Sequence, residues 1–385
     1  MQTRKVVRWM SLGVAASCTV ALAHSWRRPF PHDPYNTGCE RRPIDLVICL
    51  DTSGSMTALI DSARAKLWDI VHQLAKAKPT PQLRVGLLTY GSPNVSTAGA
   101  GWVVRQMDLT HDLDGLYARM MSLTTNGGEE YVGWVLNDAL KTMNWSRDPR
   151  ALKLIFVAGN ESADQAAEVF NFRAVAERAR VEGITINAVY CGNFQIGLSE
   201  KWQEVALHGG GDFSAIDMER GTVQIQTPYD KELFELNIKL NATYIPYGSR
   251  GDARWKQQQE QDANAERLGL QTAGTRVAAK ASPLYNNKDW DLLDAAAAGD
   301  VKLESVAKED LPAAMQPMSA AEREAYVGRK QAERTEVQRQ IQDLSARRDG
   351  FLEDKRKTAN PGQAGLDEAM LQSIRKQAES KGFTF

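Results

Sequence analysis

Continuous apolar runs that alternate with helical patterns constrain what this chain of 385 residues can fold into. Strands are predicted at residues 44–50, 83–90, 102–107, 152–158, 184–191 and 213–216, and helices at 59–77, 113–123, 130–143, 163–182, 200–207 and 228–240. Strands that are apolar throughout are typical of a mostly parallel sheet covered by helices on both faces. We therefore expect a doubly wound α/β fold. Right-handed crossovers would bring the ends of the first and fourth strands together at the centre of the sheet.

The N-terminus has the pattern of a secretory signal peptide at residues 1–23. Arg4, Lys5 and Arg8 precede an apolar stretch at residues 10–22, and the run Ala21-Leu22-Ala23 offers a cleavage site. Residues 24–42, rich in Pro and Arg, are expected to be a linker. Two alternatives stay open, namely an uncleaved membrane anchor and a lipid anchor at Cys18. We expect an exported protein of the periplasm, cell envelope or extracellular space, and a bacterial source.

The composition changes beyond Tyr247, where polar and Ala-rich sequence follows. Residues 244–319 are expected to be an irregular or helical linker region, and residues 320–385 a charged helical region. A long helix is predicted at 320–357, with Val337, Ile341 and Leu344 on one stripe. Lys330, Arg334 and Arg348 fall on that same stripe. These charges favour a helix that lies along the main domain over a short self-associating coiled coil.

The loop that leaves the first strand carries Asp51, Ser53 and Ser55 at alternate positions. A carboxylate and two hydroxyls placed in this way can all face one hard cation, because Mg²⁺ prefers oxygen ligands and uses only one or two carboxylates. The carboxyl ends of the strands are also where open α/β folds bind their ligands. The alternative is structural, since Asp and Ser favour turns and Ser55 is well placed to cap the helix that follows.

This loop, together with the strand–helix alternation, resembles the von Willebrand factor A domain over residues 43–243, a Rossmann-like fold. The resemblance implies a metal-ion-dependent adhesion site (MIDAS) formed by the D-x-S-x-S loop, a Thr from a second loop and an Asp after the fourth strand. Here the second loop reads Thr125-Asn126-Gly127-Gly128-Glu129-Glu130, and Gly159 occupies the place of the Asp. A carboxylate gained at Glu129 or Glu130 would offset the one lost at Gly159. The candidate metal ligands are Asp51, Ser53, Ser55, Thr125, Glu129 and Glu130, for Mg²⁺ or Mn²⁺.

The resemblance implies adhesion or another protein–protein interaction, in which the partner offers an acidic side chain to the metal. The alternative is a structural or assembly component of the cell envelope with a degenerate metal site, which contacts its partners through the C-terminal helices. With 47 basic and 48 acidic residues, neither a nucleic acid nor an anionic membrane surface is suggested as a partner. No catalytic triad order and no His/Glu metal pair stands out in the sequence, so we expect no enzyme.

Overall fold

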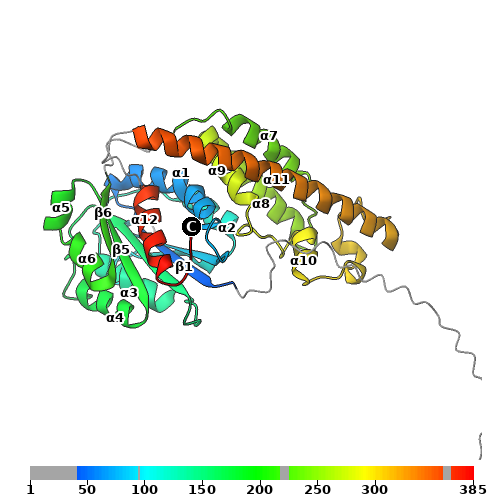
Figure 1. Ribbon diagram of the computed structural model, residues 1–385. Coiled ribbons are helices and arrows are strands. Elements are labelled where there is room, and N and C mark those ends of the chain that lie inside the picture. Colours follow the sequence, from blue (N-terminus) through cyan, green and yellow to red (C-terminus); the bar gives the residue numbers. More distant parts are fainter. Residues whose placement is uncertain (1–40, 94–95, 217–224, 359–365) are drawn as a thin grey trace, which may run out of the picture.

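The computed structural model describes residues 41–93, 96–216, 225–358 and 366–385 (Figure 1). The expected signal peptide and all but the last two residues of the expected linker lie outside the described residues. Within the described ranges, none of the helices combines the length and the apolar character that crossing a membrane requires.

A six-stranded sheet forms the centre of the N-terminal half, with the strand order β3-β2-β1-β4-β5-β6. Its strands are β1 (Pro43–Asp51), β2 (Gln82–Tyr90), β3 (Val104–Thr110), β4 (Leu152–Gly159), β5 (Ile184–Cys191) and β6 (Gly210–Ile216). Only the pair β2–β3 is antiparallel. The prediction of a mostly parallel, doubly wound sheet is confirmed, and β1 and β4 lie side by side at its centre.

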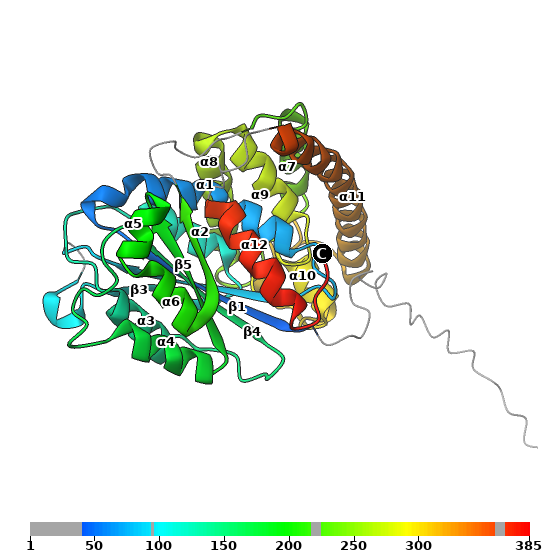
Figure 2. The ribbon, with the colours of Figure 1, turned by 60° about the vertical axis from the view of Figure 1, so that its left-hand side comes forward.

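The two faces of the sheet are covered by different helices, as Figure 2 shows. Side chains of β1 alternate between the layers: Leu46, Ile48 and Leu50 pack beneath α1, whereas Val47 and Cys49 pack on the α3, α4 and α6 side. The helices of this part are α1 (Thr57–Leu74), α2 (Leu113–Ser122), α3 (Val132–Thr142), α4 (Phe172–Val181), α5 (Phe194–Ser199) and α6 (Trp202–Gly209). Strands buried on both faces explain why the predicted runs are apolar throughout.

The structure differs from the expected elements mainly at their ends. The helix expected at 163–182 begins only at Phe172, because Asn171 caps it by accepting a hydrogen bond from Arg173 N at 3.0 Å. The strand expected at 102–107 lies at 104–110, and Trp102 before it has a positive φ of 56°. Helix α5 was not among the predicted elements.

The C-terminal part is helical; it begins with the helix expected at 228–240 and continues with helices of the expected extension. It comprises α7 (Asp230–Asn241), α8 (Gly251–Leu268), α9 (Leu270–Lys280), α10 (Leu292–Ala298), α11 (Ala320–Thr358) and α12 (Leu366–Glu379). Helix α9 packs against α1, α7 and α8, and α12 packs against α1 and the strands β4, β5 and β6. The chain therefore returns to the sheet after α11, and the last helix on the α1 face comes from the end of the sequence (Figure 1).

Helix α11 lies along α7 and α9 and buries the stripe that the sequence singled out. Val337, Ile341 and Leu344 are all buried. Arg334 and Arg348 on the same stripe are also buried, and each forms an ion pair within the chain. Arg334 pairs with Asp291 and Asp294, and Arg348 pairs with Asp230. The stripe thus faces the protein's own helices, which is the alternative that its charges favoured.

Candidate metal centre

The carboxyl end of β1 brings Asp51 into the interior of the protein. Asp51 is the last residue of the strand and is 0% exposed. The next residue fixes the loop, since Thr52 donates from both its backbone N and its Oγ1 to the carbonyl oxygen of Tyr90, at 2.8 and 2.9 Å. Asp51 Oδ1 accepts from Ser53 N at 2.7 Å, and Ser53 Oγ lies 3.3 Å from Ser55 Oγ. The three predicted oxygen-bearing side chains are therefore neighbours.

The second loop brings Glu130 to Asp51. Asn126 N donates to the carbonyl oxygen of Thr52 at 3.0 Å, and Glu130 N donates to Gln165 Oε1 at 3.0 Å, so both ends of the loop are anchored. Glu130 is 5% exposed and lies within hydrogen-bonding reach of the Asp51 carboxyl group. Gly91 allows this approach, because a Cβ atom there would be 2.8 Å from Asp51 Oδ1 and 3.2 Å from Glu130 Cγ.

The electrostatics of this pair are unusual, because two acids are buried together. Asp51 Oδ2 and Glu130 Oε2 are both inaccessible to solvent, and among the described residues they have no hydrogen-bond partner. Burial, first of all, raises the pKa of each carboxyl, and the negative charge of Glu161 raises both further. For Glu130 the nearness of the Asp51 carboxyl group adds to the rise in pKa. Without a cation, the pair therefore favours holding a proton, since two adjacent buried carboxylates repel each other.

The other two predicted ligands of the second loop face elsewhere. Glu129 is exposed, and its carboxylate accepts a hydrogen bond from the hydroxyl of Tyr131. Thr125 Oγ1 forms a hydrogen bond of 2.9 Å with Thr57 Oγ1 at the start of α1. Of the two glutamates that the sequence left as alternatives, only Glu130 lies beside Asp51.

Gly159, where the family pattern has an Asp, ends β4 directly beside the pair. A Cβ atom at this position would be 3.2 Å from Asp51 Oδ2 but only 2.5 Å from the hydroxyl oxygen of Tyr90. That hydroxyl donates to the carbonyl oxygen of Ala158 at 2.9 Å. The space for the missing side chain is thus occupied by Tyr90. Nearby, Asn160 reaches the exposed Ser55, with Nδ2 3.2 Å from Ser55 Oγ.

The donor set fits a hard divalent cation. Among the described residues, His, Cys, Asp and Glu nowhere form a group of three that could hold a metal. The set is therefore two carboxylates, Asp51 and Glu130, and two hydroxyls, Ser53 and Ser55. Mg²⁺ is commonly held by one or two carboxylates while it keeps several waters, so two carboxylates are enough. The two carboxylate oxygens without partners would gain one by binding it.

Three residues of this arrangement were missed in the sequence. Tyr90 ends the neighbouring strand β2, Gly91 directly follows it, and Gln165 lies in the segment before α4. The position of Tyr90 at the end of an apolar strand could have placed it near Asp51, because parallel strands have their carboxyl ends at one edge of the sheet. The role of Gln165 depends on turns between residues 160 and 171 that no periodicity indicates.

Comparison with known proteins agrees with this fold. Residues 45–207 match the family model of the von Willebrand factor type A domain. No curated protein matches the chain. Among solved structures, proximal thread matrix protein 1 from the mussel byssus, in a form with a zinc-occupied MIDAS motif, is 16% identical with a TM-score of 0.37. That match covers 47% of this chain and 43% of the mussel chain.

Two bacterial structures are also similar. The von Willebrand domain of a type V pili tip protein from Porphyromonas gingivalis is 16% identical, with a TM-score of 0.36, and covers 46% of this chain and 90% of that chain. The pilus adhesin SpaC from Lactobacillus rhamnosus GG is 14% identical, with a TM-score of 0.36, and covers 47% of this chain and 29% of that chain. On its family match and its sheet, this chain contains a von Willebrand factor type A domain, at residues 45–207.

Proposed function

We propose that this domain binds a protein partner through a divalent cation, Mg²⁺ or Mn²⁺, held by Asp51, Ser53, Ser55 and Glu130. The observation that carries the proposal is the buried pair Asp51 and Glu130, whose oxygens Asp51 Oδ2 and Glu130 Oε2 have no hydrogen-bond partner in the described part of the chain. A cation between them would remove the repulsion and satisfy both oxygens. In a degenerate site we would expect at least one of these carboxylates to be replaced or paired with a basic residue.

Each side chain has a separate part in this proposal. Asp51 and Glu130 supply the negative charge that attracts a cation, and the hydroxyl of Ser53 favours their ionised forms, because it lowers the pKa of both carboxyls. Ser55 is exposed and marks the side from which a partner approaches. When bound, the cation supplies an open coordination position that an acidic side chain of the partner can fill.

The proposal is one of recognition and not of catalysis, since von Willebrand factor A domains are generally interaction modules. We further propose that the chain is exported and acts in adhesion at the bacterial envelope. The alternative, an assembly component that binds through its C-terminal helices, predicts partner binding that is indifferent to cations. The two proposals therefore differ in their response to a chelator.

Thermal unfolding of a protein that comprises residues 41–385 tests the cation site. A ligand at about 100 times its dissociation constant stabilises the folded state by about 2.7 kcal/mol. We expect Mn²⁺ to raise the unfolding temperature by several degrees, and EDTA to reverse the rise. The response should be absent in Asp51→Ala and Glu130→Gln. It should be kept in Glu129→Gln, a matched control at the adjacent exposed glutamate. No response in the wild type, or a response kept in Glu130→Gln, would reject the proposed ligand set.

A further inference from the structure

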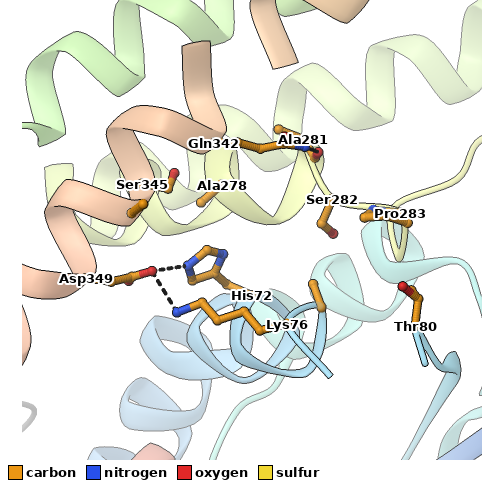
Figure 3. Close-up of a pocket in the computed structure, with 12 residues that line it drawn as sticks. His72, Lys76, Thr80, Ala278, Ala281, Ser282, Pro283, Gln342, Ser345 and Asp349 are labelled. Carbon is orange, nitrogen blue, oxygen red and sulfur yellow. Dashed lines mark hydrogen bonds and ion pairs between the residues drawn. The ribbon is translucent and has the colours of Figure 1, made fainter. Parts of the chain in front are cut away.

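A second candidate site lies at the opposite end of α1, in a pocket of about 220 Å³ between α1, α9 and α11 (Figure 3). The pocket exists because small side chains face one another there and do not fill the space between the helices. Ala75 directly follows the last residue of α1, Ala278 comes from α9, and Ala346 comes from α11. Most of the accessible lining surface is therefore apolar, although several of the lining side chains are polar.

Three polar side chains meet on one wall of this pocket. Asp349 Oδ2 lies 3.0 Å from His72 Nε2 and 2.7 Å from Lys76 Nζ. An ionised carboxylate only accepts, so Nε2 carries the hydrogen of this bond. The hydrogen bond and charge of His72, together with the charge of Lys76, outweigh the burial of Asp349 and lower its pKa to about 2. Asp349 is thus ionised at neutral pH.

The pocket also contains a hydroxyl without a partner. Ser345 is 4% exposed and lines the pocket, and its buried Oγ has no hydrogen-bond partner within the described ranges. Figure 3 shows Ser345 on the same helix as Asp349, on the pocket side, and it shows the second ring nitrogen of His72 turned away from Asp349. A buried hydroxyl without a partner is costly, which points to a ligand that supplies one.

The charge balance indicates the kind of ligand. Lys76 and Asp349 pair as one positive and one negative charge, and Arg375 adds a second positive charge. Arg375 lies close by, since it donates to Gln73 Oε1, the same oxygen that Lys76 contacts. The wall is therefore cationic overall. One monoanion would neutralise it.

We propose that this pocket binds a small monocarboxylate with an apolar body, with its carboxylate on Ser345 and Lys76. The size agrees, because a dry cavity of about 150 Å³ already accepts benzene. The body would lie against the alanines and Pro283. This site is separate from the proposed cation site, and neither depends on the other.

Benzoate is a suitable probe, with benzamide as its neutral counterpart. We expect the full chain to bind benzoate in a calorimetric titration, and to bind benzamide about tenfold more weakly, because one hydrogen bond between charged groups is then lost. Ser345→Ala and Lys76→Gln should each weaken benzoate binding by a similar factor. Ser282→Ala is the matched control, because Ser282 also lines the pocket but already donates to the carbonyl oxygen of Ala279 at 2.6 Å.

Other outcomes would overturn the proposal. Equal affinity for benzoate and benzamide would show that the negative charge of the ligand does not contribute to binding. Benzoate binding that both Ser345→Ala and Lys76→Gln retain in full would place the ligand elsewhere. The absence of any heat of benzoate binding at millimolar concentration would mean that the pocket takes no monocarboxylate of this size. Lys76 is exposed, so its variant keeps the test valid even if Ser345→Ala is unstable.

Discussion

The hydroxyl of Tyr90 lies where a side chain at Gly159 would begin, with only 2.5 Å between its oxygen and a Cβ atom built on the glycine. Tyr90 ends β2 and reaches past the end of β1 to β4, where it donates to the carbonyl oxygen of Ala158. The residue is 1% exposed and has no room to move aside. The missing Asp of the family pattern and the presence of Tyr90 are therefore one structural change.

This relationship predicts that changes at the two positions are not additive. Gly159→Ala should destabilise the protein by about 1–3 kcal/mol, because the added methyl group collides with Tyr90. Tyr90→Phe alone should cost about 1 kcal/mol through the lost hydrogen bond. In the double variant the collision is absent, so the combined loss should fall short of the sum by at least about 0.5 kcal/mol. Urea unfolding of the four proteins measures this, and strict additivity would contradict it.

A second prediction concerns Glu130 in the absence of metal. The Glu130→Gln side chain keeps its shape and brings N–H donors to the buried Asp51 carboxylate, which has an oxygen without a partner. We expect the metal-free variant to be more stable than the metal-free wild type by about 1 kcal/mol. The same change should abolish stabilisation by Mn²⁺. Opposite effects with and without metal separate a ligand from a purely structural residue.

Urea unfolding in EDTA and in Mn²⁺ tests this prediction, with Glu129→Gln as the control. Glu129 is exposed and contacts Tyr131, so its variant should follow the wild type in both conditions. A Glu130→Gln protein that is less stable in EDTA and still gains stability from Mn²⁺ would show that Glu130 has a structural role only.

The sheet was predictable because its central strands are buried on both faces, and their sequences are apolar without interruption. The C-terminal helices were harder to predict, because they bury charges. Helix α9 places Arg276 and Lys280 in the interior, each at most 1% exposed, and both pair with Asp262 of α8. Hydrophobic periodicity does not register a helix whose inward face is ionic. This explains why residues 244–319 read as a polar linker region.

The candidate site was predictable only in part. The spacing of Asp51, Ser53 and Ser55 places three oxygens on one loop whatever the details of the fold. The choice between Glu129 and Glu130 depends on which of two adjacent side chains turns inward, and the anchor for that turn is Gln165, 35 residues away in the sequence. Long-range contacts of this kind leave no pattern in a single sequence.

A third prediction follows from the packing of α9 on α1. Trp68 of α1 is 0% exposed. Its ring centroid lies 6.5 Å from that of Tyr285, in an edge-to-face arrangement, and 4.5 Å from the guanidinium carbon of Arg276. A fragment that ends at residue 243 loses both partners and also α12, which covers the sheet. We expect this fragment to lack a cooperative unfolding transition and to aggregate, because a large apolar face becomes exposed.

The measurement is near-ultraviolet circular dichroism with urea unfolding, on the fragment 41–243 and on the described chain 41–385. A soluble fragment that unfolds cooperatively at the same urea concentration as the longer chain would show that the helices after residue 243 are independent of the domain.

The last prediction concerns Asp262, which holds two buried cations. Its carboxylate lies 2.8 Å from Lys280 Nζ and 2.6 Å from Arg276 Nε. Burial alone would raise the pKa of Asp262, but the charges of Lys280 and Arg276 and their hydrogen bonds outweigh it and hold the pKa below its usual value. A carboxyl with a lowered pKa in the folded state contributes stability above its unfolded pKa of about 3.9, and this contribution is lost as the pH falls further.

Asp262→Asn should therefore lower the free energy of unfolding by about 3–5 kcal/mol at neutral pH, because it leaves Lys280 buried without its carboxylate partner and Arg276 with Asp114 alone. The difference from the wild type should shrink as the pH falls below about 4, where the wild-type carboxyl begins to lose its advantage. Asp343→Asn is the control, because the pair of Asp343 with Arg339 is exposed and should matter little. Urea unfolding between pH 7 and pH 3 measures both variants. The loss in free energy of unfolding caused by Asp262→Asn could also be small at pH 7 or independent of pH. Either result would mean that this buried network does not hold the helices to the domain.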